Sequence, residues 1–222
     1  GVYHFIADGG DCPIIPYSKP IYNAKSDLWV PYLHQKYDVP DYFNGSASCG
    51  PTSALMAIQR YDRLPPHPIT CSNPYTHTHD FGWYVPNEYE YNGYVYDHPG
   101  LAPKVGDYYS DTTVYGAHGF CTSPTDRVGT YGDSLVAILN QHNVYSAWTS
   151  YSPAWSVYQG EIDDNYPMCA LLYFGSSGHY NCWRGYFTDH TVISNDPYGD
   201  HNTSPWGQYN GEMAYYDWPG YD

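Results

Sequence analysis

The stretch MCALLYFGSSGHYNCWRGYF, residues 168–187, predicts a β-hairpin. Two runs rich in β-prone and aromatic residues flank the turn sequence Gly-Ser-Ser-Gly at 175–178. If the chain folds back about the middle of this turn, Cys169 lies directly opposite Cys182. The hairpin therefore predicts a cross-strand disulfide between these two cysteines, and it directs His179 to the opposite face of the sheet.

The segments on both sides of the hairpin extend this pattern. A short strand is predicted at 191–194, directly before Asn195-Asp196-Pro197, because the proline cannot continue a central strand. Three more elements are expected upstream of the hairpin: a helix at 133–143, a strand at 144–148 and a helix at 152–165.

The motif Ser48-Cys49-Gly50-Pro51 predicts the start of another helix. Ser48 can cap this helix, and Pro51 suits its first turn. Apolar residues within 54–58 give it a side that packs into a core, and the Pro-Pro pair at 65–66 ends it. Cys49 is thus expected at a helix N-terminus.

The rest of the chain has little periodicity. Residues 65–130 contain many tyrosines and several histidines among closely spaced turn residues, which predicts a loop-rich insertion with a few short strands. We interpret the whole chain as an extended N-terminal arm at 1–28, one α+β domain at 29–200 and a C-terminal tail at 201–222.

The composition narrows the range of partners. Lys and Arg number 8 against 23 Asp and Glu, so the formal charge of the 222 residues is −15. Nucleic acid is not expected as a partner, because its binding depends on Lys and Arg contacts to phosphate. No apolar run approaches the roughly 20 residues of a membrane-spanning helix, so we expect no membrane span.

The six cysteines form no CxxC pair, so the spacing of zinc ribbons and of thioredoxin-like redox sites is missing. We expect an extracellular disulfide set instead. Cys71 and Cys121 in the insertion are expected to be disulfide-bonded, and Cys12 is an alternative partner for either.

Two further features fit a secreted or cell-surface protein. The sequence begins at Gly1 without a basic-then-apolar leader, as a mature chain would after removal of a signal peptide. Asn44 and Asn202 open Asn-x-Ser/Thr sequons and are candidates for glycosylation.

Three features together point to nucleophilic thiol chemistry. Cys49 lies at a helix start, His179 opens a strand after a glycine-containing turn, and the polar pair Asn195-Asp196 ends the next strand. A helix N-terminus lowers the pKa of a thiol, an imidazole takes up its proton, and a third group orients the imidazole.

These residues resemble the motifs of the papain-like cysteine peptidases, specifically the branch of bacteriocin-processing (double-glycine leader) peptidases and their secreted relatives. The matching text is VPYLHQ at 30–35, CGPTSALMAI at 49–58, YPMCALLYFGSSGHYNCWRGY at 166–186 and VISNDPYG at 192–199. The resemblance implies a papain-like fold, in which the nucleophile helix packs on an antiparallel β-sheet. It also implies cofactor-free hydrolysis of a peptide or protein substrate, with cell-wall peptides as one candidate class.

The resemblance assigns roles to single residues. Cys49 matches the nucleophile, His179 the general base and Asp196 the residue that orients the histidine. Gln35 matches the side chain that donates to the oxyanion, beside the backbone N–H of Cys49. Asn195 is the alternative third member, but adjacent strand residues face opposite ways, and we favour Asp196.

The histidines and the tyrosines each have another interpretation. The segment His77-Thr78-His79-Asp80 contains an H-x-H pattern, but such a pattern in a loop is more often a solvated turn, so no metal site is predicted. Aromatic clusters at 84–96 and at 215–218 favour a second hypothesis, a structural or adhesive subunit that self-associates through tyrosines and the terminal arms while its catalysis is idle.

Overall fold

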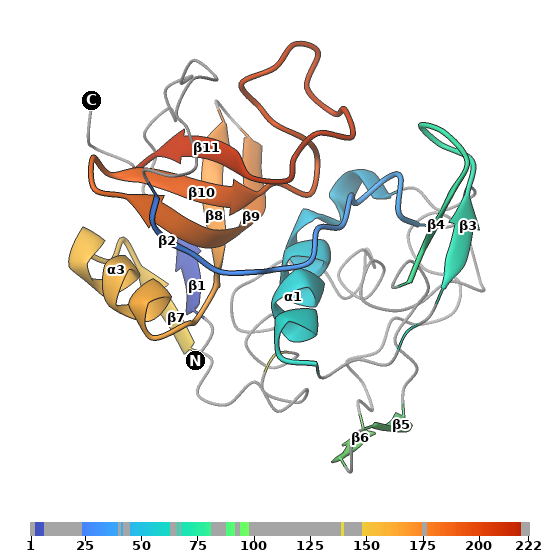
Figure 1. Cartoon of the computed structure of the whole chain (residues 1–222), viewed down its shortest axis with the longest axis horizontal. Helices are drawn as coiled ribbons and strands as arrows, with labels where there is room; N and C mark the ends of the chain where they lie inside the picture. Colours follow the sequence, from blue (N-terminus) through green and yellow to red (C-terminus); the bar gives the residue numbers. More distant parts are fainter. Residues whose placement is uncertain are drawn as a thin grey trace.

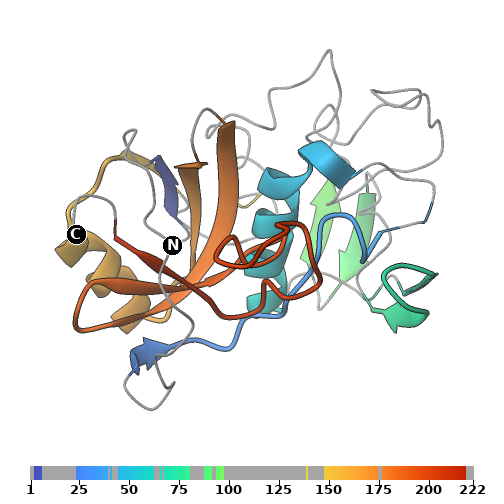
Figure 2. The same cartoon turned by 90° about the horizontal axis from the view of Figure 1, so that it is seen from above.

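The molecule consists of a twisted sheet, a central helix and outlying hairpins (Figures 1 and 2). The computed structural model describes residues 3–6, 24–39, 41, 45–62, 66, 68–80, 88–91, 94–97, 139, 148–174 and 177–218. Helix α1 (Cys49–Arg60) lies beside the sheet, and α3 (Trp155–Asp163) packs at the far end of the same sheet. This α+β arrangement is the one expected for a papain-like fold.

The main sheet has seven strands in the order β11-β10-β9-β8-β1-β7, with β2 also paired to β9. It is antiparallel apart from the two parallel pairings of β1, with β7 and with β8. The strands are β1 (Tyr3–Ile6), β2 (Ala24–Asp27), β7 (Trp148–Tyr151), β8 (Met168–Phe174), β9 (Ser177–Phe187), β10 (Thr191–Asn195) and β11 (Ala214–Asp217).

The hairpin of β8 and β9 has the register that the sequence predicts. Cys169 pairs with Cys182, and Leu172 pairs with His179. β10 then returns antiparallel to β9, so Asn195 lies opposite Cys182. Because side chains alternate along a strand, His179 and Cys182 lie on opposite faces, as expected.

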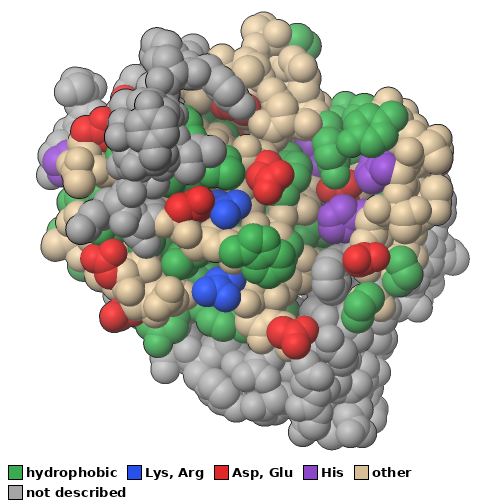
Figure 3. Space-filling model, in the orientation of Figure 1, with side chains coloured by type: hydrophobic (Ala, Val, Ile, Leu, Met, Phe, Trp, Pro, Cys, Tyr) green, Lys and Arg blue, Asp and Glu red, His purple; other side chains and the backbone are tan. Residues whose placement is uncertain are grey.

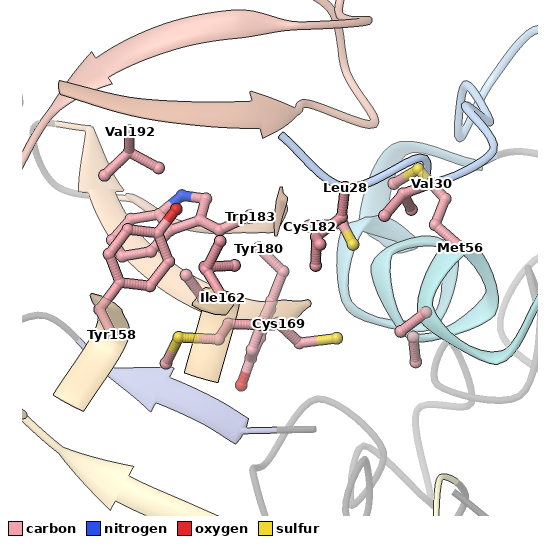
Figure 4. Packing of buried hydrophobic residues seen from close by; sticks show 14 of the residues in the cluster. Leu28, Val30, Met56, Tyr158, Ile162, Cys169, Tyr180, Cys182, Trp183 and Val192 are labelled. Carbon is pink, nitrogen blue, oxygen red and sulfur yellow. The ribbon is translucent and has the colours of Figure 1, made fainter. Parts of the chain in front are cut away.

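The predicted Cys169–Cys182 disulfide is wrong, because both residues are free thiols. Direct opposition in register is not sufficient for a disulfide, since the two side chains must also turn toward each other. Both thiols are instead completely buried in the hydrophobic core, among the side chains drawn in Figure 4. Burial raises the pKa of both thiols, that of Cys182 to about 12, so neither is a ready thiolate.

The two ends of the chain contribute more to the sheet than the sequence indicates. The stretch interpreted as an N-terminal arm supplies β1 and β2. The stretch interpreted as a C-terminal tail supplies β11, which pairs with β10 along Thr191–Ser194. Strand β11 thus continues the main sheet to residue 217.

The core lies between the sheet and the two helices. Helix α1 is buried from Gly50 to Gln59, so both sides of this helix are covered. At the α3 end, Tyr158 stacks on Trp218. The ring of Trp183 lies edge-on to Tyr158 and is tilted relative to Trp218. Such aromatic pairs each add about 0.5–1.5 kcal/mol beyond their buried area. Tyr216 and Trp218 are thus core residues and do not form part of a tyrosine-rich surface.

Two small hairpins fall within the predicted insertion. β3 (Ile69–Cys71) pairs with β4 (His77–His79), and β5 (Glu88–Tyr91) pairs with β6 (Tyr94–Asp97). Cys71 is a free, buried thiol, so the disulfide expected for it is wrong. Its sulfur contacts the carbonyl of Val39 at 3.4 Å.

Several sequence-based expectations concern parts of the chain outside the described residues. These are Cys12, Asn44, Cys121 and, apart from Leu139, the helix at 133–143. The predicted strand at 144–148 meets the described residues only at Trp148, where β7 begins. Within the described parts of the chain, no helix is long and apolar enough to cross a membrane.

Candidate active site

Cys49 is the first residue of α1, as the sequence predicts. A short 3-10 helix, η2 (Gly45–Ala47), leads into it. Ser48 occupies the N-cap position, but its hydroxyl makes no capping hydrogen bond, and only its carbonyl accepts from the N–H of Thr52. The first N–H groups of a helix have no intrahelical partners, so the backbone N–H of Cys49 lies at an electropositive end.

His179 connects this helix to the sheet. It is the third residue of β9, it is buried, and its Nε2 lies 2.7 Å from Oδ1 of Asp196. Its ring also hydrogen-bonds to the Cys49 thiol, which leaves Nδ1 as the nitrogen that faces the sulfur. The structure thus brings together Cys49, His179 and Asp196 from α1, β9 and the end of β10.

The charges of this group are coupled. Burial by itself would lower the pKa of His179, but the negative charge of Asp196 and the hydrogen bonds raise it to about 10. Burial by itself would raise the pKa of the Cys49 thiol, but the hydrogen bond and positive charge of His179, together with backbone hydrogen bonds from Tyr180 and Gly50, outweigh it, so this pKa is lowered. The arrangement favours a thiolate–imidazolium pair.

Asp196 is held from several directions. Its Oδ1 accepts from the N–H of Tyr198 at 2.8 Å as well as from His179, and its Oδ2 accepts from the hydroxyl of Tyr216 at 2.7 Å. Its N–H donates to the carbonyl of Gly211, where a Cβ would lie 2.0 Å from the Asp196 carbonyl. Only glycine at position 211 allows this close approach.

Asn195, the alternative third member, faces away from His179. Its Nδ2 donates to the carbonyl of Val30 at 2.9 Å, and its Oδ1 accepts from the N–H of Met213 and from Arg184. Asn195 therefore joins the chain segment before α1 to the sheet. Of the two adjacent residues, only Asp196 contacts the histidine.

Gln35 is buried beside the start of α1. Its Nε2 donates to the carbonyl of Gly45 at 2.8 Å and has a longer contact of 3.3 Å with the carbonyl of Ser46. If the Gln35 amide were flipped, its Oε1 would face these two carbonyl oxygens and could not hydrogen-bond to them. The amide nitrogen is therefore the end that faces Gly45 and Ser46. A Cβ on Gly45 would lie 1.6 Å from the Gln35 carbonyl, so the close approach of these segments requires glycine.

An aromatic group covers His179, and sequence reasoning missed it. The ring of Trp206 lies edge-on to that of His179, with 4.9 Å between centroids, and Phe174 lies at 5.8 Å. The indole Nε1–H of Trp206 donates to the carbonyl of Gly199. Trp206 belongs to the loop between β10 and β11, which extends toward the start of α1 (Figures 1 and 2). No local sequence pattern marks a loop residue for this role.

The other candidate residues lie elsewhere. Nδ2 of Asn202 donates to Oδ1 of Asp200 and to the carbonyl of Tyr215, and a glycan on this nitrogen would replace one of the two hydrogens. His77 and His79 both approach Asp38. Within the described ranges, no group of three or more His, Cys, Asp or Glu side chains has an arrangement that could hold a metal ion.

Comparison with known proteins identifies the family of this chain. Residues 28–221 match the family model described as the Peptidase_C39 like family. Comparisons with curated proteins and with solved structures find no match. Because the family match spans most of the 222 residues, the chain belongs to this family, a branch of the papain-like cysteine peptidases related to the bacteriocin-processing peptidases.

Proposed function

We propose that the protein hydrolyses peptide bonds through a Cys49–His179–Asp196 triad and a covalent acyl-enzyme. The observation that carries this proposal is the chain of hydrogen bonds from the Cys49 thiol through His179 to Asp196, at the N-terminus of α1. The same three groups are required to activate a thiol, to move its proton and to orient the imidazole.

The first half of the reaction forms a thioester. The Cys49 thiolate attacks the carbonyl carbon of the substrate, and the carbonyl electron pair moves onto oxygen. The backbone N–H of Cys49 and the amide of Gln35 donate to this oxyanion. One hydrogen of Gln35 Nε2 is held firmly by Gly45, so the more weakly held one is the donor. Protonated His179 then gives its Nδ1 proton to the leaving amine as the C–N bond breaks.

The second half regenerates the thiolate. Neutral His179 takes a proton from water, and the hydroxide equivalent adds to the thioester carbonyl. The C–S bond breaks, the carboxylic acid product leaves, and the imidazolium–thiolate pair is restored. Asp196 keeps the ring oriented throughout, and Trp206 and Phe174 limit the access of water to the His179–Asp196 hydrogen bond.

The proposed substrates are peptides or proteins that are not strongly acidic. The formal charge of −15 repels acidic segments and attracts basic ones. We also propose that the protein is secreted or displayed at the cell surface. There it would meet the proposed substrates, which are extracellular proteins or cell-wall peptides.

The proposal is tested by hydrolysis of a fluorogenic library of neutral and lysine-containing peptides with two matched cysteine variants. Cys49→Ala removes the nucleophile, and Cys71→Ala removes a buried thiol that contacts Val39. We expect Cys49→Ala to abolish hydrolysis and Cys71→Ala to retain it. Hydrolysis by a folded Cys49→Ala protein would refute the assignment.

A further inference from the structure

A second buried carboxylate lies next to the proposed active site. Asp38 is fully buried, and its oxygens accept from three separate segments. Oδ2 accepts from the backbone N–H of His34 at 2.7 Å, Oδ1 lies 2.8 Å from Nε2 of His77, and the hydroxyl of Tyr209 lies 2.9 Å from Oδ1. Asp38 thus joins the turn at 34–38, the strand β4 and the loop between β10 and β11.

The turn that Asp38 closes contains Gln35. The N–H of Asp38 donates to the carbonyl of His34, while its carboxylate accepts from the N–H of His34. Nδ1 of the His34 ring accepts from the N–H groups of Lys36 and Tyr37. Gln35 lies within this closed turn, and its N–H donates to the carbonyl of Pro197, directly after Asp196. The direction of the Gln35 side chain therefore depends on this turn.

The geometry requires His77 to be the cation that faces Asp38. Nδ1 of His77 lies 2.8 Å from the carbonyl of Tyr75, and Nε2 lies 2.8 Å from the Asp38 carboxylate. Both partners only accept hydrogen bonds, so both ring nitrogens must carry hydrogen, which is the imidazolium form.

The other charged groups near this pair do not replace His77. Burial lowers the pKa of His34 to about 4, so its ring is neutral. Nζ of Lys36 lies over the ring of Tyr198, 5.5 Å from its centroid. Nε2 of His79 is 3.8 Å from Asp38, outside hydrogen-bonding distance. Asp41 is the remaining acid that acts on His77. It hydrogen-bonds to Ser72, and its negative charge further raises the pKa of His77.

We propose that Asp38 is a positioning residue for Gln35 and that protonated His77 is the countercharge that keeps Asp38 in place. This inference rests on the proposed function, because it concerns the oxyanion donor of the same site. In Figure 3, histidine and acidic side chains lie together on the side of the molecule where Figure 1 shows β3 and β4, so the countercharge is within reach of solvent.

The pH dependence follows from the sign of the His77 shift. Burial lowers its pKa, but the hydrogen bond to Tyr75 and the interactions with Asp38 outweigh burial, so the pKa is raised above 6.5. The imidazolium is therefore present below this pKa and is lost as the pH rises through it. Above that pH, Asp38 is left buried without its cation, and we expect the turn that holds Gln35 to loosen.

The test compares two reactions of the same thiol. Acylation of Cys49 by p-nitrophenyl acetate passes through an oxyanion, whereas alkylation by iodoacetamide does not. The ratio of the two second-order rate constants thus measures the contribution of the oxyanion donors. A change in the reactivity of the thiolate affects both rate constants and cancels in the ratio. The variant is His77→Gln, which keeps an N–H donor but removes the charge. Its matched control is His79→Gln on the same strand.

We expect His77→Gln to lower the acylation rate about tenfold while alkylation stays within about twofold, since loss of a complete oxyanion donor costs about 10²–10³. His79→Gln should leave both rates within about twofold. In the unsubstituted protein the ratio should fall as the pH rises through the His77 pKa, and in His77→Gln it should be flat. An unchanged ratio, or equal loss of both reactions in a folded His77→Gln protein, would overturn the inference. Failure of the unsubstituted protein to alkylate at Cys49 would instead refute the proposed function, and this inference with it.

Discussion

The Asp196 carboxylate can orient His179 because its own position is fixed by Tyr216 and by the backbone of Tyr198. Its negative charge is also the largest of the effects that raise the His179 pKa. The Asp196 side chain therefore has two roles: it orients the His179 ring and it supplies a negative charge. The substitution Asp196→Asn keeps the volume of the side chain and removes its charge.

Asp196→Asn is expected to reduce kcat/KM for peptide hydrolysis by about 100-fold or more, because His179 loses its countercharge. The control is Asp200→Asn, which changes a buried acid four residues along the same loop, where its Oδ1 accepts from the backbone N–H of Asn202. Steady-state kinetics on one peptide substrate checks both variants. Equal losses in the two variants would show that the loop, and not the Asp196 charge, is responsible.

A backbone position beside Asp196 gives a second residue-scale prediction. Gly211→Ala would place a Cβ 2.0 Å from the Asp196 carbonyl, a backbone atom that cannot move aside easily. We expect a loss of about 1–3 kcal/mol in the free energy of unfolding. Gly160→Ala is the control, because among the described residues no atom beyond its chain neighbours and its own helix backbone lies within 4 Å of the added Cβ, and alanine favours a helix such as α3. Urea denaturation compares the two, and a neutral Gly211→Ala would contradict the tight packing described here.

At the scale of single elements, the aromatic cluster joins α3 to the sheet. Trp183 on β9 is fully buried and contacts Tyr158 of α3 and Trp218. We expect Trp183→Ala to cost about 3–5 kcal/mol of unfolding free energy. Trp29→Ala, at a tryptophan that is 68% exposed, should change it by no more than about 0.5 kcal/mol. Similar urea midpoints for the two variants would argue against this cluster as part of the core.

The elements differ in how far the sequence predicts them. The register of β8 and β9 follows from a short turn between two β-prone runs, so the opposition of Cys169 and Cys182 is predictable. The helix at Cys49 follows from local signals of helix starts. β1 and β11 are four-residue strands that are held by pairing with distant strands, and no local pattern reports a distant partner.

The site residues divide in the same way. Cys49, His179 and Asp196 lie at element ends, where the motif and the strand alternation identify them. Trp206 and Asp38 act through a long loop and a turn, and their positions depend on tertiary contacts such as the Tyr209–Asp38 hydrogen bond. The disulfide expectation failed because register does not determine whether two thiols turn toward each other.

At the scale of the whole molecule, the net charge of −15 is the dominant long-range property. It lowers the association rate of acidic substrates and raises that of basic ones, and salt screens both effects over a Debye length of about 10 Å at 0.1 M. Lys and Arg side chains are sparse on the face drawn in Figure 3, which agrees with the low total of 8 in the sequence.

Two peptides with the same scissile bond, one flanked by lysines and one by glutamates, test this property. We expect the lysine peptide to have the higher kcat/KM at low salt and the difference to shrink as the ionic strength rises. A preference that does not change with salt would assign the selectivity to local contacts near Cys49.

The central claim, an activated thiol at Cys49, is tested most directly by the pH dependence of iodoacetamide labelling, followed by peptide mapping. Because the Cys49 pKa is lowered from its ordinary value of 9.0, the thiolate persists as the pH falls below 9.0 and is lost only through the lower folded-state pKa. We expect rapid labelling of Cys49 at neutral pH, with Cys71, Cys169 and Cys182 unlabelled in the folded protein because they are buried thiols. Labelling of Cys49 with the midpoint of an ordinary thiol, or no labelling at all, would contradict the account.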